Sequence, residues 1–292
     1  MTPPADILAH IGGQMPDLTP NQRRLAEFAR RDPQAMAVST VTELSGLTGV
    51  SPATIVRFSK ALGFAGFNGL QRELRRSLRA GLRGPERFRH ARTPDPASET
   101  ALTPAVRQEM ANIAALQDQY DPDGFRSAVR MLSDASRVVV IGSRSTVALA
   151  HHLWFGLTKA GLSADRAGSA DSQAHDLLDR LDPHGCAVVI GFPRYLRDLV
   201  ALTDAARAAG RRVLVITDSP FSPLHGTVRL FAPVESASFV AFHAAPMVLI
   251  AALLSEIAAD RPDRTLAALQ RFEARAARQG LFEPPDPPQP KD

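Results

Sequence analysis

Residues 41–64, VTELSGLTGVSPATIVRFSKALGF, constrain the fold of this chain more than any other segment. Their pattern predicts two short helices joined by a tight turn at Gly49, because glycine adopts the positive φ angle that such a turn requires. Ser51 and Pro52 start the second helix, since serine caps free backbone N–H groups and proline tolerates the first helical position. Gly63 ends that helix. The segment therefore has the pattern of a helix-turn-helix, which usually places its second helix in the major groove of DNA.

Apolar spacing within this segment separates a buried face from an open one. Four residues are expected to form a small core between the two helices: Leu44, Val50, Ile55 and Phe58. The open face supplies the predicted DNA contacts, which are Ser51, Pro52, Ala53, Thr54, Arg57 and Lys60. Arg57 would reach a guanine edge or a phosphate, and Thr54 a phosphate or a thymine methyl. The alternative is that Arg57 and Lys60 are only solvated, because such spacings also occur in bundles that bind no DNA.

Further helices are predicted on both sides of the motif. One begins at Thr19-Pro20 and ends at Asp32-Pro33, where another short helix starts. Its inward-facing residues are expected to be Leu25, Phe28 and Ala29. After the motif, Phe64 and Phe67 would dock a helix over 67–80. That helix bears four arginines, which form either a solvated face or phosphate contacts beside the motif: Arg72, Arg75, Arg76 and Arg79.

Charge is distributed unevenly along the 292 residues. Residues 1–92 hold 14 Lys and Arg against 7 Asp and Glu, a net charge of +7, whereas the remaining residues hold 20 against 23, a net charge of −3. A basic N-terminal part suits a polyanion such as DNA. The single cysteine, Cys186, excludes a disulfide framework and a multi-cysteine metal site. We see no signal peptide after Met1 and no apolar stretch of membrane-spanning length, so we expect a cytoplasmic protein.

From residue 104 the pattern changes to short apolar runs that alternate with helical stretches. We expect strands at 137–141, 186–190, 212–216 and 227–232, and helices at about 104–119, 122–134, 146–160, 195–209 and 239–258. Fully apolar strands separated by helices indicate a parallel sheet covered on both faces. The predicted fold class is an all-α helix-turn-helix bundle followed by an α/β domain. Ligands bind at the carboxyl ends of such strands, here the loops Gly142–Thr146, Gly191–Arg197 and Thr217–Ser222.

Arginines and small polar residues after these strands are the candidates for binding a small effector. The predicted effector contacts are Arg144, Ser145, Thr146, Asp171, Ser172, Arg194, Arg197, Glu235 and Ser236. Guanidinium groups bind phosphate or carboxylate through paired donors, so an anion is expected. Two alternatives stay open. Arg194 and Arg197 would pair with Asp198 or with a neighbouring subunit, and the polar residues at 171–173 and 235–238 would cap helices.

Residues 5–80 resemble the N-terminal domain of the RpiR/MurR family of bacterial transcriptional regulators. The matching stretches are LTPNQRRLAEF, the 41–64 segment and GFNGLQREL, and the most specific string is SPATIVRFSKALGF. Residues 122–260 resemble the SIS (sugar isomerase) domain that usually accompanies it, through VVVIGSRSTVALA, AARAAGRRVLVITDSPFSPL and the late apolar helix. The resemblance implies a DNA-binding regulator whose SIS domain binds a phosphosugar and thereby changes its hold on DNA.

Two loops depart from the pattern that this resemblance implies. Family members usually hold phosphate with a Gly-x-Gly-x-Ser-like first loop and a Ser-x-Ser-Gly-x-Thr-like second loop. Here Arg144 stands where the second glycine would be, and the second loop, GFPRYLRD, keeps neither serine and has Leu196 at the threonine position. The expected effector is a small anionic metabolite: a sugar phosphate or, because of Arg144, Arg194 and Arg197, a carboxylate-bearing compound.

The predicted organisation has four parts. These are a helix-turn-helix domain at 1–80, a linker at 81–103, a SIS-type effector-binding and oligomerisation domain at 104–278, and a disordered tail at 279–292. We expect a homodimer or homotetramer, because paired half-sites in DNA require at least two readers. The expected partners are a double-stranded DNA operator and the effector, without membrane contact.

Catalysis is the main competing hypothesis, because SIS domains also serve as isomerases. An aldose–ketose isomerase needs a positioned base, and the available candidates are His151, His152, His175, Glu235 and His243. Adjacent His151 and His152 do not share a helix face, and the apolar surroundings of His243 favour a packed core residue. We therefore assign no catalytic residue, cofactor or metal ligand. A ligand-independent DNA binder is the third hypothesis, but such a sheet supplies a pocket that DNA binding alone does not require.

Overall fold

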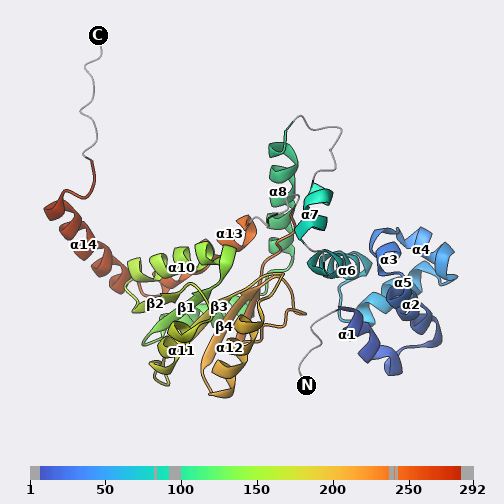
Figure 1. Cartoon of the computed structure of the whole chain (residues 1–292), viewed down its shortest axis with the longest axis horizontal. Helices are drawn as coiled ribbons and strands as arrows, with labels where there is room; N and C mark the ends of the chain where they lie inside the picture. The colour runs from blue at the N-terminus through green and yellow to red at the C-terminus, as the bar shows by residue number, and fades with distance from the viewer. Residues whose placement is uncertain (1–6, 82–83, 92–99, 237–239, 241–242, 284–292) are drawn as a thin grey trace, which may run out of the picture.

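The computed structural model describes residues 7–81, 84–91, 100–236, 240 and 243–283. Figure 1 shows a group of short helices beside a larger unit in which helices cover a sheet. The N-terminal group contains α1 (Ile7–Gln14), α2 (Pro20–Arg31), α3 (Pro33–Val38), α4 (Val41–Thr48), α5 (Pro52–Ala61) and α6 (Phe67–Gly81). The predicted fold class, an all-α bundle followed by an α/β domain, is confirmed.

Helices α4 and α5 form the predicted helix-turn-helix. Gly49 between them has a φ angle of +67°, and its N–H donates to the Ser45 carbonyl at 2.8 Å, which ends α4 in a left-handed cap. The Ser51 hydroxyl accepts a hydrogen bond from the Thr54 N–H and caps α5. The predicted core residues of this domain are all buried: Leu25, Phe28, Ala29, Leu44, Val50, Ile55 and Phe58. An apolar core therefore fixes the two helices against α2.

The C-terminal unit is built on a parallel sheet. Among the described residues it has five strands, β1 (Val138–Gly142), β2 (Ala164–Ala167), β3 (Cys186–Ile190), β4 (Arg212–Thr217) and β5 (Val228–Phe231). Their order is β2-β1-β3-β4-β5, and each neighbouring pair is parallel. Four strands match the predicted apolar runs. The sequence pattern misses β2, because this half-buried edge strand, ADRA, contains two charged residues.

The sheet is the middle layer of three. Alternate strand residues point to opposite faces, so Val138 and Val140 pack under α9, α10 and α13, whereas Val139 and Ile141 pack under α11 and α12. Burial on both faces explains why the inner strands are continuous apolar runs. The helices of this unit are α8 (Leu102–Asp118), α9 (Pro122–Ser133), α10 (Val147–Lys159), α11 (Ser172–Asp179), α12 (Arg197–Ala208), α13 (Ala244–Asp260) and α14 (Pro262–Gln279).

One segment contains more helix than the predicted organisation suggests. The expected linker, 81–103, contains a further helix, α7 (Gly84–Ala91), and the start of α8. Helix α14 ends at Gln279, the first residue of the segment predicted as a disordered tail, and most of that tail, 284–292, lies outside the described residues. Over the ranges that the structure describes, every helix is too short or too polar to cross a membrane.

The turn at Gly49 provides a test with a matched control. An alanine at this position would have to adopt the same left-handed φ angle, which is strained for a residue with a Cβ, and its Cβ would lie 3.3 Å from the Arg24 guanidinium. Gly49→Ala should therefore lower the free energy of unfolding by about 1–2 kcal/mol. An added Cβ at Gly46, within α4, meets no atom within 4 Å. Gly46→Ala should therefore raise that free energy by about 0.5–1 kcal/mol. Urea unfolding followed by circular dichroism measures both, and effects of the same sign would contradict the assigned turn.

Candidate functional site

Helix α5 presents an open face in the full chain. Five of the six predicted DNA contacts are exposed: Ser51, Pro52, Ala53, Arg57 and Lys60. The Arg57 side chain is oriented by a hydrogen bond from Nη2 to the Thr54 hydroxyl at 2.8 Å. This face is therefore accessible to solvent while the C-terminal unit is in place.

Thr54 does not face solvent as predicted. Its side chain lies against the protein, only 8% of the residue is exposed, and its hydroxyl contacts Ser51 Oγ at 3.0 Å as well as Arg57. Thr54 thus supports the helix cap and orients Arg57. Val56, which is 36% exposed on the same helix, is a candidate contact that the sequence analysis missed, because apolar residues were assigned to the core. A branched apolar side chain suits a thymine methyl group.

Two of the four arginines of α6 are engaged within the protein, which neither of the alternatives drawn from the sequence includes. Arg75 Nη1 donates to the Ala37 carbonyl at 3.2 Å and joins α6 to α3. Arg76 is nearly buried between two carboxylates. Arg72 is half-buried, and the side chain of Arg79 lies outside the described part of the structure. Tertiary contacts within the protein therefore occupy at least two of the four.

The carboxyl ends of β1 and β3 form the crevice at which the strand order reverses. From β1 the chain continues to β2 on one side of the pair, and from β3 it continues to β4 and β5 on the other side. In parallel sheets of this kind, ligands bind between the two strands at which the order reverses. A Cβ on Gly142 would lie 2.7 Å from the Thr146 carbonyl, so only glycine lets α10 begin this close to β1. The predicted first and second loops, 142–146 and 191–197, both start at this crevice.

Thr146 joins the two sides of the crevice. Its hydroxyl lies 2.9 Å from the Ser143 carbonyl and 3.1 Å from the Ile190 carbonyl, and it accepts a hydrogen bond from the Ser143 N–H. The residue is 6% exposed. Its polar group is therefore used by the fold, rather than being open for the predicted effector contact.

Two polar groups at the crevice remain without partners among the described residues. They are the buried Ser143 hydroxyl and the Nδ1 atom of His243. The other ring nitrogen of His243, Nε2, lies 3.4 Å from Ser145 Oγ, and its ring stacks at 5.5 Å on Phe192 from the second loop. Burial lowers the pKa of His243, so its imidazole is neutral at neutral pH.

The position of His243 corrects the sequence analysis. Helix α13 begins at Ala244 rather than near residue 239, so His243 is the residue at the N-terminal end of the helix and not a core residue within it. Its side chain meets the first loop from a segment about 100 positions away in sequence. No local pattern contains this information, because it depends on how α13 packs across the sheet.

Three candidate arginines follow the crevice strands. Arg144, Arg194 and Arg197 are exposed, and none has an ion pair with another described residue. The predicted alternative of a pair with Asp198 is therefore not formed within this chain. Arg144 has a φ angle of +56°, the left-handed conformation that a glycine would adopt without strain. Its guanidinium is open to a ligand at a cost in backbone energy.

The other predicted effector contacts have local roles. Asp171 accepts a hydrogen bond from the Ala174 N–H at the start of α11. It also accepts a hydrogen bond from the Ser169 hydroxyl, which lowers the pKa of Asp171. Ser172 is the exposed first residue of that helix. The Glu235 carbonyl accepts from Asn112 of α8, and the Ser236 hydroxyl donates to the Val240 carbonyl. Asp171 thus follows the helix-cap alternative.

The third predicted ligand loop, 217–222, lies against the N-terminal unit instead of an open pocket. Asp218 Oδ2 accepts from Arg76 Nη1 at 2.6 Å, and Arg76 Nε also donates to Glu73 at 2.9 Å. The Ser219 hydroxyl donates to Glu73 at 3.1 Å, and the Tyr195 hydroxyl donates to Asp218. Burial raises the pKa of Glu73. We call these five residues the Arg76 cluster.

An apolar contact lies beside the Arg76 cluster. The Phe221 ring from the third loop packs at 5.0 Å from the His10 ring and 5.8 Å from the Phe64 ring, and it joins the apolar core of the helix-turn-helix domain. The predicted docking role of Phe64 is thus extended, because its ring also meets the other unit. In Figure 1, α6 lies on the side of the helical group that faces the sheet unit.

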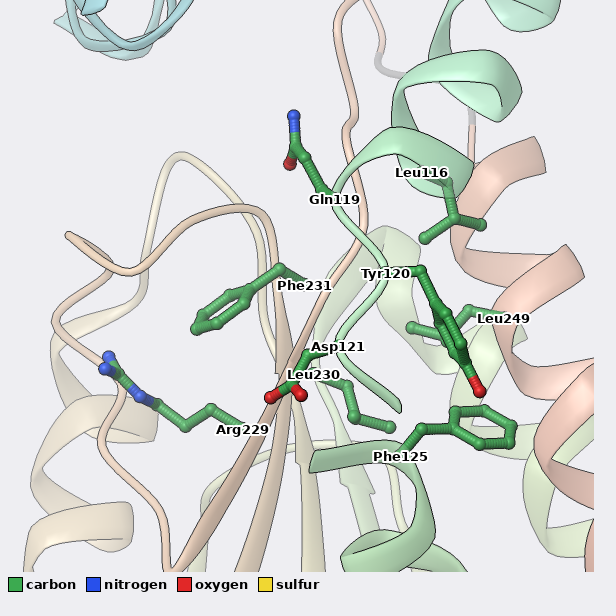
Figure 2. Close-up of a pocket in the computed structure, with 9 residues that line it drawn as sticks. All are labelled: Leu116, Gln119, Tyr120, Asp121, Phe125, Arg229, Leu230, Phe231 and Leu249. Carbon is green, nitrogen blue, oxygen red and sulfur yellow. The ribbon is translucent and has the colours of Figure 1, made fainter. Parts of the chain in front are cut away.

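A separate pocket lies between the α8–α9 turn and β5 and is too small for a metabolite. Figure 2 shows its lining, with Arg229 and Asp121 at one side and the Tyr120 and Phe125 rings at the other. Its cavity volume is about 20 Å³, enough for a water molecule but not a sugar. Within the described ranges, no group of three His, Cys, Asp or Glu side chains is placed to hold a metal ion.

Comparisons with known proteins fit both halves of this description. The family model described as "Helix-turn-helix domain, rpiR family" matches residues 5–81, and the model described as "SIS domain" matches residues 131–255. The chain belongs to the RpiR family of transcriptional regulators. The transcriptional regulator HexR of Pseudomonas aeruginosa is 25% identical over 220 residues, which are 73% of this chain and 73% of HexR.

Two solved structures have a fold similar to that of this chain. The sugar isomerase domain of an RpiR transcription factor from Sphaerobacter thermophilus is 26% identical, with a TM-score of 0.58 over 59% of this chain and 98% of that one. The NanR protein of Vibrio vulnificus, solved with ManNAc-6P, matches in fold over 96% of this chain and 100% of its own, with a TM-score of 0.58 and 15% identity.

The backbone at Arg144 gives a prediction for this RpiR-family site. Arg144→Gly relieves the left-handed strain that Arg144→Ala keeps, so the glycine variant should have a free energy of unfolding about 1 kcal/mol higher than the alanine variant. Both variants lose the same guanidinium. Chemical denaturation of the two proteins side by side measures the difference. An alanine variant as stable as the glycine variant would contradict the positive φ angle at this position.

Proposed function

We propose that this RpiR-family regulator reads double-stranded DNA with the exposed face of α5 and responds to a small anion bound between β1 and β3. The proposed DNA contacts are Ser51, Pro52, Ala53, Val56, Arg57 and Lys60, with Thr54 as a positioning residue. The proposed effector contacts are Ser143, Arg144, Ser145, Arg194, Arg197 and His243. Residues 1–80 then act on DNA and residues 104–278 sense the effector.

One observation carries the effector part of the proposal. Arg144 follows the buried Ser143, whose hydroxyl has no partner among the described residues. Arg194 and Arg197 follow the neighbouring strand β3, and none of the three arginines has an ion pair with another described residue. A buried hydroxyl without a hydrogen bond costs about 1–3 kcal/mol, which a ligand or a water molecule can recover. Arginine side chains suit phosphate and carboxylate groups because they offer paired donors. The neutral His243 ring adds one further donor or acceptor.

The effector class that we propose is a sugar phosphate or a carboxylate-bearing metabolite. NanR, a protein of the same fold, is seen with ManNAc-6P, which supports the sugar phosphate. The arginines at positions 144, 194 and 197 support either anion, because a guanidinium pairs with both. The Thr146 hydroxyl already donates to backbone carbonyls of the protein. Fewer neutral donors are therefore left to bind the hydroxyl groups of a sugar ring.

We also propose that the protein acts as a homodimer or homotetramer in the cytoplasm. A single helix-turn-helix reads one half-site, and a symmetric pair reads two. The described helices of the C-terminal unit carry exposed apolar side chains on which copies can associate: Val106, Met110, Ile113, Val248, Leu266 and Leu269. No catalytic role is part of the proposal, in keeping with relatives named as transcriptional regulators.

Arg57 tests the DNA part of the proposal. Arg57→Ala should weaken binding to a specific duplex by about 1–3 kcal/mol if the guanidinium reads a base. The duplex is one enriched from a random library by the unaltered protein, and fluorescence anisotropy at fixed salt gives the affinity. Arg126→Ala, on the exposed surface of α9, is the matched control and should leave the affinity unchanged. Equal affinities of the Arg57 variant and the control would refute the role of Arg57.

A panel of small molecules tests the effector part. Sugar phosphates, carboxylates and neutral sugars are compared by the thermal shift of the full chain, where an effector at one hundred times its Kd adds about 2.7 kcal/mol of stability. The double variant Arg194→Ala/Arg197→Ala should lose the shift, whereas Arg126→Ala keeps it. A strong shift with neutral sugars alone would overturn the anion proposal. Conversion of a sugar phosphate during incubation would show the competing isomerase activity instead.

A further inference from the structure

The Arg76 cluster joins the DNA-reading domain to the effector domain through groups that are almost fully enclosed. The side chains of Arg76, Glu73 and Asp218 are exposed by only 14%, 9% and 1%. Burial acts to lower the pKa of Arg76, but the hydrogen bond to Glu73 and the charge of Asp218 outweigh it and raise that pKa, so Arg76 stays charged. One cation between two carboxylates is a specific arrangement, because the loss of Arg76 leaves two buried carboxylates without a counter-charge.

This type of contact suits a reversible joint between domains. Each charged group recovers its hydration when the two units separate, so a buried ion cluster fixes orientation more than it adds stability. Beside the cluster, the Phe221 ring packs between His10 and Phe64 and adds an apolar part to the contact. The partners of Arg76 and Phe221 therefore define the geometry of the joint.

The second loop connects this joint with the crevice between β1 and β3. Near its start, the Phe192 ring stacks on His243, which lies beside Ser145. Three residues later, the Tyr195 hydroxyl donates to Asp218 within the Arg76 cluster. Asp218 also accepts from the Thr217 hydroxyl at 3.2 Å, so the end of β4 is held in the same network. The second loop thus contacts both the crevice and the Arg76 cluster.

The joint leaves the DNA-reading face open. Pro52, Arg57 and Lys60 are exposed while α6 is docked on the third loop. Docking therefore leaves these side chains accessible to solvent. Its effect is to fix the direction in which α5 projects from the sheet unit, and two half-sites are read together only when both helices of a symmetric pair are held at the right spacing.

We propose that the Arg76 cluster is a clamp that holds the DNA-reading domain in one orientation, and that Tyr195 makes the second loop its control element. The link to an effector at the crevice and the effect on paired half-sites rest on the proposed function, whereas the docking contact itself does not. The clamp increases the effective concentration of the second recognition helix at its half-site. Its release frees each reader to move independently.

Three variants of the full chain test the clamp. Arg76→Ala leaves two buried carboxylates facing each other, Phe221→Ala removes the apolar contact, and Tyr195→Phe removes only the hydroxyl to Asp218. The control is Arg137→Ala, which breaks a 2.6 Å ion pair with Asp165 inside the effector domain. Circular dichroism verifies that each variant is folded. Hydrogen exchange of α6 and of residues 217–222 measures docking without DNA or effector.

We expect amide exchange in both segments to rise by roughly tenfold in the Arg76 and Phe221 variants, less in the Tyr195 variant and not in the control. Affinity for a duplex with two half-sites should fall by about tenfold, while affinity for one half-site changes less than about twofold. Unchanged exchange in all three variants overturns the clamp. Unchanged exchange in Tyr195→Phe alone overturns the control role of the second loop. If the unaltered protein does not bind a half-site at all, the result would instead refute the proposed function.

If Arg76→Ala does not fold, Phe221→Ala carries the same test. Its side chain lies in the third loop at the surface of the effector domain, and the ion cluster stays complete. A raised exchange rate confined to α6 and residues 217–222 supports the clamp. A raised rate throughout the N-terminal domain shows instead that Phe221 stabilises the fold of that domain, and this result overturns its role as a joint.

Discussion

The parallel pairing of β1 with β3 is the constraint on which both proposed functional regions depend. It sets Val138 against Cys186 and Gly142 against Ile190, so that two loops distant in sequence leave the sheet at one edge. Thr146 closes the pair by reaching the Ile190 carbonyl. Because β4 is added in parallel to β3, the third loop emerges at the same edge. The crevice and the docking surface of the DNA-reading domain are thus neighbours as a result of strand register.

This edge divides its loops between two tasks. The first loop carries Arg144 in a strained conformation and faces His243, whereas the third loop supplies Asp218 and Phe221 to the helical domain. The second loop takes part in both, through Phe192 and Tyr195. A domain that senses a metabolite needs such a shared element, since a bound ligand changes a distant contact only through groups whose arrangement differs between two states.

Much of the fold was predictable because its signals are local. Gly49, Ser51 and Pro52 fix the turn and the helix start by backbone conformation and capping, which depend on adjacent residues alone. The inner strands were predictable because burial on both faces requires continuous apolar runs. The edge strand β2 is not predictable in this way, because it is only half-buried and its sequence, ADRA, is not an apolar run. Thr54 is predicted to face solvent but is buried, because its hydroxyl contacts Ser51 and Arg57.

The sequence by itself determined the helix-turn-helix, the parallel α/β domain and the arginines that follow its strands, because caps, glycines and apolar runs act over a few residues. Only the tertiary structure decided that Arg76 faces Asp218 across 142 positions and that His243 meets Ser145 across 98. An exposed helical arginine and a buried interdomain one have the same local pattern. The difference between them is the desolvation and pairing of the charge, which exist only once the two domains have packed together.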